Sequence, residues 1–279
     1  MPSTFRATDA ANYERLMGRW SRRLAIPFIE HAGIADGESV LEAGCGTGSL
    51  TFALGRAARL AKLTAIDYAD VYVAAVRARN EAVDVSIEQG DVCDLHFDDA
   101  SFDRTLSLLV LHFVTQPERA VAEMRRVTRP GGTVAAAVWD AAGGMPSQRM
   151  FWDIAAMLDE SALVARAKAF SRPGVRAGDL AALWREAGLV DIDDRSLFIR
   201  MDYASFDDYW SPFLGGEGGP AAFLSTLDAR HRDTLEEHVR SAYLAGAGDG
   251  PRSFVAAAWS CRGTVPRLGV SQSTTGVFS

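Results

Sequence analysis

The sequence contains only three cysteines, Cys45, Cys93 and Cys261, among its 279 residues. They are widely spaced, and none belongs to a Cys-x-x-Cys pair or to a Cys/His cluster of the kind that holds a metal ion. The sequence therefore predicts no metal site. It also predicts three reduced thiols, as expected for a cytoplasmic protein.

Long apolar segments are also missing. No run of about 18 apolar residues occurs anywhere, so no segment is expected to cross a membrane. The first twenty residues carry several charges and lack the apolar centre of a signal peptide. Both absences favour a cytoplasmic location.

Basic residues are fewer than acidic ones. Lysine and arginine number 29 against 36 aspartates and glutamates, which gives a formal net charge of −7. Such a chain has no general attraction to phosphate backbones or anionic lipids, so we expect no nucleic-acid partner. A hydrophobic fraction of 48% is typical of a globular protein. The composition is compatible with either a monomer or a homodimer.

Hydrophobic patterning predicts strands that alternate with helices in the first half of the chain. Strands are expected at residues 39–41, 63–66, 85–89, 102–111 and 133–139, and helices at 13–32, 50–60, 71–78 and 118–128. This alternation indicates an α/β fold with a mostly parallel sheet and helices on both faces.

The regular alternation of strands and helices ends after residue 140. Helices are expected at 148–158 and 177–186, strands at 190–201 and 253–260, and further helical segments at 207–214 and 221–244. We interpret these helical segments as insertions into one α/β domain that form a lid.

A glycine-rich loop follows the first strand, with glycines at positions 44, 46 and 48. Glycines allow a sharp turn and a close approach of a ligand to the backbone. The third glycine of the dinucleotide-binding G-x-G-x-x-G pattern is absent, because Ser49 occupies its position. Glu42 would also repel a pyrophosphate, whereas it can attract an ammonium group. Both features disfavour NAD.

Two further acidic residues follow neighbouring strands. Asp67 ends the second strand, where a carboxylate can accept hydrogen bonds from both ribose hydroxyls. Asp91 follows the third strand and can accept one from an adenine amino group, with Val92 and Tyr68 beside the ring. Three loops at adjacent strand ends thus predict one site for an adenosine-like ligand.

Taken together, residues 40–51, Asp67, Gly90 with Asp91, residues 102–103 with 108–112, and residues 126–132 resemble the class I methyltransferase family. More narrowly they resemble its small-molecule members related to the ubiquinone/menaquinone-biosynthesis methyltransferases. The resemblance covers about residues 13–140. It implies a Rossmann-like, seven-stranded sheet with an antiparallel edge strand, and S-adenosyl-L-methionine as the cofactor.

The resemblance also implies a role for each matching position. The methionine part of the cofactor would contact the end of the first strand, the glycine loop and the backbone of the fourth strand, the ribose would contact the second strand, and the adenine the third. The residues concerned are Glu42, Gly44, Cys45, Gly46, Thr47, Gly48, Asp67, Tyr68, Asp91, Val92 and Leu108.

Candidate acceptor residues lie elsewhere in the chain. The segment containing Tyr13 and Trp20 is similar to the helix that closes over the cofactor in this family. Trp139 and Tyr209 are candidates for an apolar acceptor pocket, and the alternative for all four aromatic residues is the hydrophobic core. His112 is the candidate general base, or else a buried histidine that only shapes the pocket. A base is optional, because positioning and desolvation supply much of the catalysis of methyl transfer.

We expect a single methyltransferase domain over residues 1–263, with its cofactor-binding part at about 13–140. The lid insertions are expected at about 141–188 and 204–250, and a flexible tail at 264–279. The predicted function is transfer of a methyl group to an oxygen, carbon or nitrogen atom of a small organic acceptor. The alternatives are an NAD-dependent oxidoreductase and a non-catalytic S-adenosylmethionine-binding module.

Overall fold

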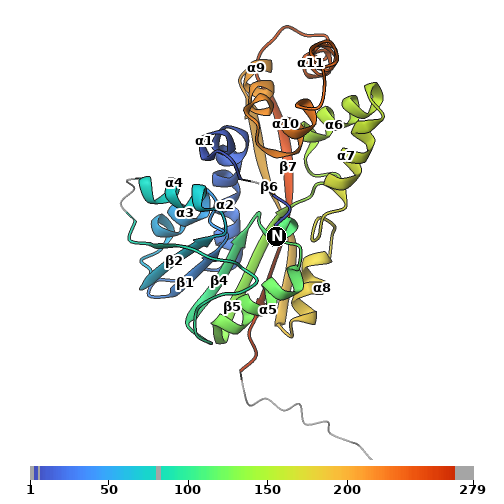
Figure 1. Ribbon diagram of the computed structural model, residues 1–279. Helices are drawn as coiled ribbons and strands as arrows, with labels where there is room; N and C mark the ends of the chain where they lie inside the picture. The colour runs from blue at the N-terminus through green and yellow to red at the C-terminus, as the bar shows by residue number, and fades with distance from the viewer. Residues whose placement is uncertain (1–2, 6, 80–82, 268–279) are drawn as a thin grey trace, which may run out of the picture.

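The computed structural model describes residues 3–5, 7–79 and 83–267. Their strands form one sheet in the order β3-β2-β1-β4-β5-β7-β6 (Figure 1). The strands are β1 (Ser39–Ala43), β2 (Lys62–Asp67), β3 (Ser86–Gln89), β4 (Phe102–Leu108), β5 (Thr128–Trp139), β6 (Val190–Tyr203) and β7 (Arg252–Thr264).

The predicted fold class is confirmed. Strands β1 to β5 pair in parallel, whereas β7 runs antiparallel to both β5 and β6. The antiparallel strand therefore lies one place in from the edge of the sheet, with β6 outermost.

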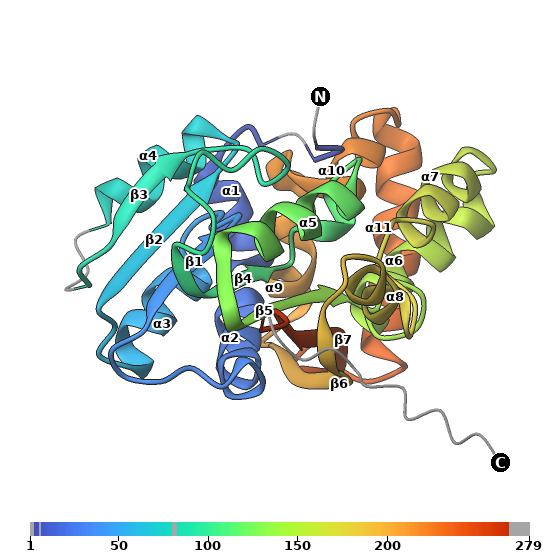
Figure 2. The same cartoon turned by 90° about the horizontal axis from the view of Figure 1, so that it is seen from below.

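Helices cover both faces of this sheet. Helices α2 and α3 pack together on one face, and α5 packs with α8 on the other (Figure 2). The helices are α1 (Ala10–Tyr13), η1 (Glu14–Gly18), α2 (Arg19–Ala32), α3 (Ser49–Ala57), α4 (Asp70–Ala78), η2 (Leu111–Phe113), α5 (Pro117–Val127), α6 (Pro146–Leu158), α7 (Ser161–Phe170), α8 (Asp179–Glu186), α9 (Phe206–Trp210), η3 (Ser211–Gly215), α10 (Gly218–Leu224) and α11 (Ala229–Leu244).

The side chains of β5 show why this strand lies at the centre of the molecule. Ala135 and Ala137 belong to the core on the α2 and α3 face, while Val134, Ala136 and Val138 belong to the core beneath α5 and α8. Successive side chains of a strand point to opposite faces, so a strand buried on both faces reads as a continuous apolar run.

Five helices form a cap, defined here as α6, α7, α9, α10 and α11. They gather around the extended ends of β6 and β7, above the parallel strands in Figure 1. Aromatic side chains fill the interior of the cap: the ring centroids of Phe151 and Phe213 lie 5.2 Å apart, and those of Tyr209 and Phe213 lie 5.3 Å apart. The cap corresponds to most of the expected helical insertions.

Helix α8 differs from the expectation, which placed it in the lid as part of residues 141–188. It packs instead against α5, β6 and β7. The reason is Trp184, which is fully buried and whose indole N–H donates a hydrogen bond to the Val134 carbonyl at 3.0 Å. An amphipathic helix with one such anchor covers the sheet.

The expected tail also begins later than its composition indicated. Strand β7 extends to Thr264, and the backbone N–H of Val265 donates to the Gly132 carbonyl. Residues 268–279 of the expected tail lie outside the described residues. In the described ranges no helix is both long enough and apolar enough to cross a bilayer.

Candidate active site

The candidate site is a cavity of about 630 Å³ at the carboxyl ends of β1, β2 and β4. Strands β1, β2 and β3 follow one another toward one edge of the sheet, and the chain then returns to place β4 on the other side of β1. Open α/β sheets bind ligands at the crevice where the strand order reverses in this way. Eleven predicted residues line the cavity: Tyr13, Glu42, Gly44, Cys45, Gly46, Thr47, Asp67, Tyr68, Asp91, Val92 and Leu108.

Gly48, the remaining predicted cofactor residue, is not among the residues that line the cavity. It precedes α3 with a φ of +88°, and its α-carbon faces the side chains of Phe52 and Val76 behind the loop. Both this packing and the positive φ require glycine at position 48.

The glycine loop is held by the neighbouring strand β2. The backbone N–H groups of Gly44 and Cys45 both donate to the Ile66 carbonyl, at 2.9 and 2.8 Å. The N–H of Gly46 donates to Asp67 Oδ2 at 2.7 Å, and the other carboxylate oxygen of Asp67 accepts from Ala69 N at 2.9 Å. Asp67 thus joins two loops while lining the cavity between them.

Gly46 is the most open point of the loop. It has a φ of +52°, and a β-carbon placed on it would meet no protein atom within 4 Å. A left-handed backbone and an open space beside it are what a close contact between ligand and backbone requires.

Glu42 is buried at the end of β1, with 1% of its surface exposed. Its Oε2 accepts a hydrogen bond from the Thr51 hydroxyl at 2.5 Å. Burial raises the pKa of Glu42 to about 8, and the nearby charge of Asp67 adds to the rise. Before a ligand binds, the Glu42 carboxyl is therefore mostly protonated at neutral pH. A cationic group beside it would favour the carboxylate and release this proton.

The opening helix is attached to the glycine loop by its side chains. The carboxylate of Glu14 accepts a hydrogen bond from the Thr47 hydroxyl and pairs with Arg22. Glu14 lies in the π-helical turn η1. This conformation is rare in proteins overall, but where it occurs it is frequently found at functional sites. Tyr13, directly before this turn, contacts the ring of Tyr72 across the cavity rim, with centroids 5.3 Å apart.

The first described residues close the site from the other side. Thr4 N donates to the Phe113 carbonyl at 2.7 Å, and the Phe5 ring lies 4.9 Å from that of Phe113. Further along, Thr8 and Asp9 donate backbone hydrogen bonds to the buried carboxylate of Glu217 in the cap, at 2.7 and 2.6 Å. The N-terminal segment therefore bridges η2 and the cap.

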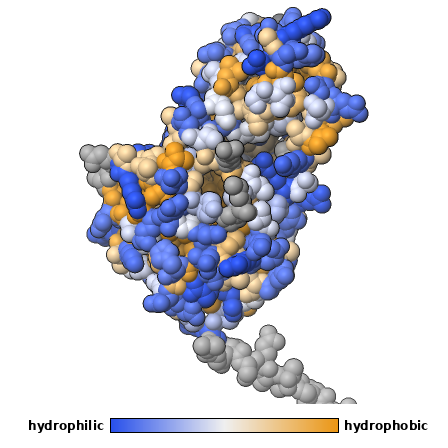
Figure 3. All heavy atoms as spheres, viewed as in Figure 1, coloured by the Kyte–Doolittle hydropathy of each residue, from blue (hydrophilic) through white to orange (hydrophobic). Residues whose placement is uncertain are grey.

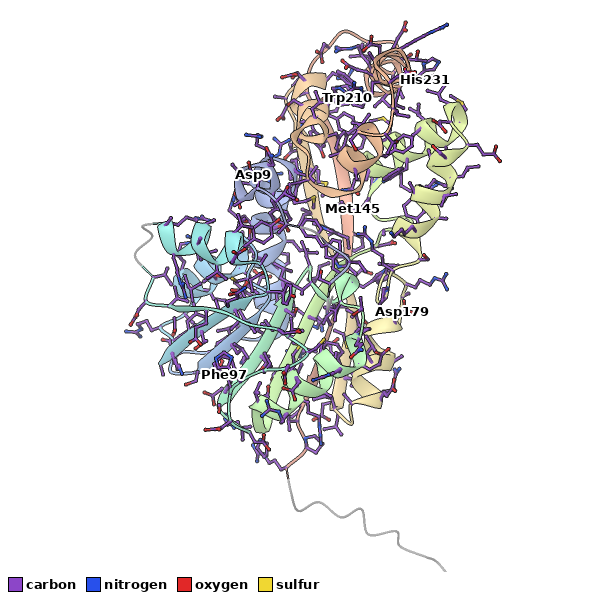
Figure 4. All side chains as sticks on the ribbon, in the orientation of Figure 1. Asp9, Phe97, Met145, Asp179, Trp210 and His231 are labelled. Carbon is purple, nitrogen blue, oxygen red and sulfur yellow. The ribbon has the colours of Figure 1, made fainter. Side chains whose placement is uncertain are left out.

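A second cavity, of about 110 Å³, adjoins the first. Four residues line both: Phe5, Tyr13, Leu109 and Phe113. A hollow is visible at the middle of the face drawn in Figure 3, beneath the cap. Figure 4 places Met145, which lines the second cavity, at the junction of cap and sheet.

Leu109 lies at the boundary of the two cavities with a φ of +63°, a backbone conformation that costs energy in a residue with a branched side chain. Its N–H donates to the Ala137 carbonyl at 2.7 Å. The expected strand at 102–111 is therefore wrong beyond Leu108, because the chain turns here into η2. Apolar composition alone does not distinguish this turn from a buried strand.

His112 lines the second cavity and is buried. Burial, reinforced by the charge of Arg172, lowers the pKa of His112 to about 3. Its Nδ1 has no hydrogen-bond partner among the described residues. The imidazole is therefore neutral at physiological pH, and in the absence of a ligand it is a weak base.

The other candidate acceptor residues divide into two groups. Trp139 lines the second cavity, as Tyr13 does. Trp20 and Tyr209 line neither cavity. Trp20 is buried beneath Arg19, whose guanidinium lies 4.2 Å from the centroid of its ring, and the Tyr209 hydroxyl donates to the Ser147 carbonyl inside the cap at 2.8 Å.

Sequence reasoning missed several cavity-lining residues, because they come from separate turns and from cap helices whose packing no local pattern reveals. The missed residues include Phe5, Leu109, Phe113, Gln148, Trp152 and Arg172.

Cys45 lies inside the glycine loop and is buried, and burial raises the pKa of its thiol well above the usual value. The thiolate form is therefore disfavoured, which fits a small packing side chain better than a nucleophile. Throughout the part of the chain that the structure describes, no three His, Cys, Asp or Glu residues are grouped as metal ligands.

Comparison with known proteins assigns residues 41–136 to a family described as "Methyltransferase domain". The chain is 33% identical over 135 residues to the ubiquinone/menaquinone biosynthesis C-methyltransferase UbiE of Bdellovibrio bacteriovorus, covering 45% of this chain and 56% of that protein. It is 31% identical over 191 residues to the O-methyltransferase cnsE of Penicillium expansum, covering 66% of this chain and 64% of the relative. The chain thus spans less than two thirds of these relatives.

Solved structures show the same fold at low identity. A phosphoethanolamine N-methyltransferase 2 of Haemonchus contortus matches with a TM-score of 0.58 at 16% identity, covering 92% of this chain and 57% of that one. The YcgJ protein of Bacillus subtilis matches with a TM-score of 0.57 at 18% identity, covering 88% and 98%. Residues 41–136 therefore match the methyltransferase family, and the curated relatives and the sheet order support a class I methyltransferase related to UbiE.

Proposed function

We propose that this chain is a cytoplasmic S-adenosyl-L-methionine-dependent methyltransferase that acts on a small organic acceptor. The observation that carries the proposal is the arrangement around Gly46. Its open backbone lies in one cavity with the buried carboxyl of Glu42 and the carboxylate of Asp67. The family match and the adjoining second cavity support the proposed activity. The three free cysteines support the cytoplasmic location.

The residues present fit this cofactor. The open space beside Gly46 admits a ligand against bare backbone, and the cavity volume lies within the range of small-molecule sites. Glu42 and residues 44–47 would hold the methionine part, with the Glu42 carboxylate facing the ammonium. Asp67 would accept from the ribose hydroxyls, and Asp91, with Val92 and Tyr68, would contact the adenine.

When bound, the cofactor supplies an electrophilic methyl group on a sulfonium whose departure leaves a neutral thioether. The protein's contribution is position and the exclusion of water. Tyr13, Leu109 and Phe113 are lining residues common to both cavities. They would bring the acceptor atom in line with the methyl group from the side of the second cavity.

His112 remains the candidate base. Its low pKa opposes proton uptake while the cavity holds no anion, because only burial and the Arg172 charge then act on the ring. A negatively charged acceptor beside the imidazole would raise its pKa toward the range in which it accepts a proton.

The alternatives have less support. An oxidoreductase would need space for a pyrophosphate beside Glu42, and Ser49 stands where the NAD pattern has glycine. The Ser49 hydroxyl donates a hydrogen bond to the Gly18 carbonyl at 3.5 Å. A non-catalytic module would bind the cofactor without turnover.

Two measurements on the purified chain separate these functions. Calorimetry with S-adenosylhomocysteine and with NAD distinguishes the cofactors, and we expect saturable binding of S-adenosylhomocysteine alone. Transfer of labelled methyl from S-adenosylmethionine to small acids, phenols and amines distinguishes the enzyme from the module. Binding without transfer to any acceptor class would favour the module.

A further inference from the structure

Arg172 is a cation in the wall of the second cavity, and it has no ion-pair partner among the residues that the structure describes. It follows α7, and its guanidinium carbon lies 4.7 Å from the centroid of the Phe113 ring. Among the described residues no carboxylate lies within ion-pair distance of Arg172, and its guanidinium makes no hydrogen bond. Burial lowers the pKa of Arg172, with no acidic group to offset it.

Two other nitrogen atoms in the same wall also lack partners. His112 Nδ1 and Trp139 Nε1 are both buried, and neither finds a hydrogen-bond partner in the described chain. Leaving such buried groups unsatisfied destabilises the ligand-free fold. The three side chains come from three different segments, after β4, at the end of β5 and after α7, yet they line one small cavity.

The rest of the wall is suited to an apolar skeleton. Met145, Trp152 and Phe170 line it from the cap, and Gln148 adds one neutral polar group. None of the described residues that line this cavity is an aspartate or a glutamate. Among the described lining residues, Arg172 supplies a positive charge, and the others are apolar side chains or neutral hydrogen-bonding groups.

We propose that the second cavity binds the methyl acceptor through a carboxylate that pairs with Arg172. The planar guanidinium presents two parallel N–H donors, which match the two oxygens of a carboxylate. A single cation in a small cavity suits one negative charge better than the two of a phosphate. This inference rests on the proposed function, and it narrows the acceptors to small organic acids with an apolar or aromatic skeleton.

The position of the arginine gives the carboxylate a role in specificity. Phe113, which lies against the guanidinium, lines both cavities. An anion held there fixes one end of the acceptor, so the remainder of its skeleton lies between the apolar cap residues and the boundary with the first cavity. Amides and esters of the same acids lack the charge and leave Arg172 unpaired.

Binding calorimetry on the full chain saturated with S-adenosylhomocysteine tests the proposal. The probes are acetate, benzoate, phenylacetate and octanoate, each beside its primary amide. We expect at least one carboxylate to bind at least tenfold more tightly than its amide. Arg172→Gln should abolish this preference and Arg172→Lys should restore part of it. Arg176→Gln, at an exposed arginine four residues later, should bind as the unmodified chain does.

A thermal measurement distinguishes this role from a structural one. An unpaired, partly buried charge destabilises the ligand-free fold, so Arg172→Met should raise the unfolding midpoint while removing carboxylate binding. If Arg172 instead stabilises the fold by packing on Phe113, Arg172→Met should lower the unfolding midpoint.

The two binding measurements distinguish failure of this inference from failure of the proposed function. The inference is overturned if S-adenosylhomocysteine binds but none of the carboxylates does, or if Arg172→Gln keeps the preference; the proposed function then stands. Failure of S-adenosylhomocysteine to bind overturns the proposed function, and the inference with it.

Discussion

The backbone N–H of Gly46 donates a hydrogen bond to Asp67 at 2.7 Å, and this contact joins the two strand ends that matter most to the site. It brings the open face of the glycine loop next to the carboxylate that ends β2. Because both groups line the same cavity, one ligand can contact bare backbone and an acidic group at once.

Asp67→Asn should weaken S-adenosylhomocysteine binding by about 10- to 100-fold, since hydrogen bonds to charged groups contribute about 1.5–3 kcal/mol. The substitution removes the charge that accepts from Gly46 and Ala69. Calorimetry measures the change. Asp98→Asn, at an exposed aspartate away from the cavity, is the control and should leave affinity unchanged. Equal affinities for both variants would contradict the placement of the site.

Gly46→Val should abolish cofactor binding, because its side chain would occupy the open space beside the loop. It also places a β-branched residue at a positive φ, at a cost of about 1–3 kcal/mol of stability. Gly246→Val is the matched control: it has a φ of +78° and open surroundings, but lies outside both cavities. We expect similar thermal shifts in both variants and loss of binding in the first alone.

Binding should depend on pH through Glu42. Its pKa of about 8 in the free protein means that a bound ammonium group, which favours the carboxylate, displaces a proton. Affinity for S-adenosylhomocysteine should therefore rise with pH between 6 and 8, by at most about tenfold per unit. Calorimetry in two buffers of different ionisation enthalpy measures the released proton. Glu42→Gln should release none, and an identical proton count in both proteins would refute this role.

Acid stability should depend on His112. Its pKa is lowered to about 3 in the fold, so below pH 6.5 the unfolded chain binds a proton that the native chain excludes. The stability that its neutral form maintains is present above pH 6.5 and is lost as pH falls. His112→Gln should remove at most about 2 kcal/mol of the loss between pH 6.5 and 5, measured by urea unfolding. An unchanged pH profile would mean that His112 ionises freely in the native state.

Much of the lining of the larger cavity was predictable because its residues are contiguous with strand ends. The loop at residues 44–47, Asp67 and Asp91 each follow a recognisable apolar strand, and parallel strands bring their carboxyl ends to one edge. Gly48 was the exception, since its place behind the loop depends on packing against Phe52.

The lining of the second cavity was not predictable in the same way. Arg172 follows α7, a helix that the hydrophobic pattern did not predict, and it lines the second cavity together with residues of α6 and α10 that lie far from it in the sequence. Trp20 was predicted from the similarity of its segment to a helix that closes over the cofactor, and Tyr209 as an aromatic residue of the lid, but both are buried in the packed core. Aromatic composition does not distinguish a pocket wall from an interior, because both bury the same apolar area.

The central claim concerns the ligand that occupies the larger cavity, which we propose to be S-adenosyl-L-methionine. Equilibrium titration of the purified chain with S-adenosylhomocysteine and with NAD tests this directly. We predict saturable micromolar binding of S-adenosylhomocysteine that is lost in Gly46→Val. Saturable binding of NAD, with none of S-adenosylhomocysteine, would contradict it.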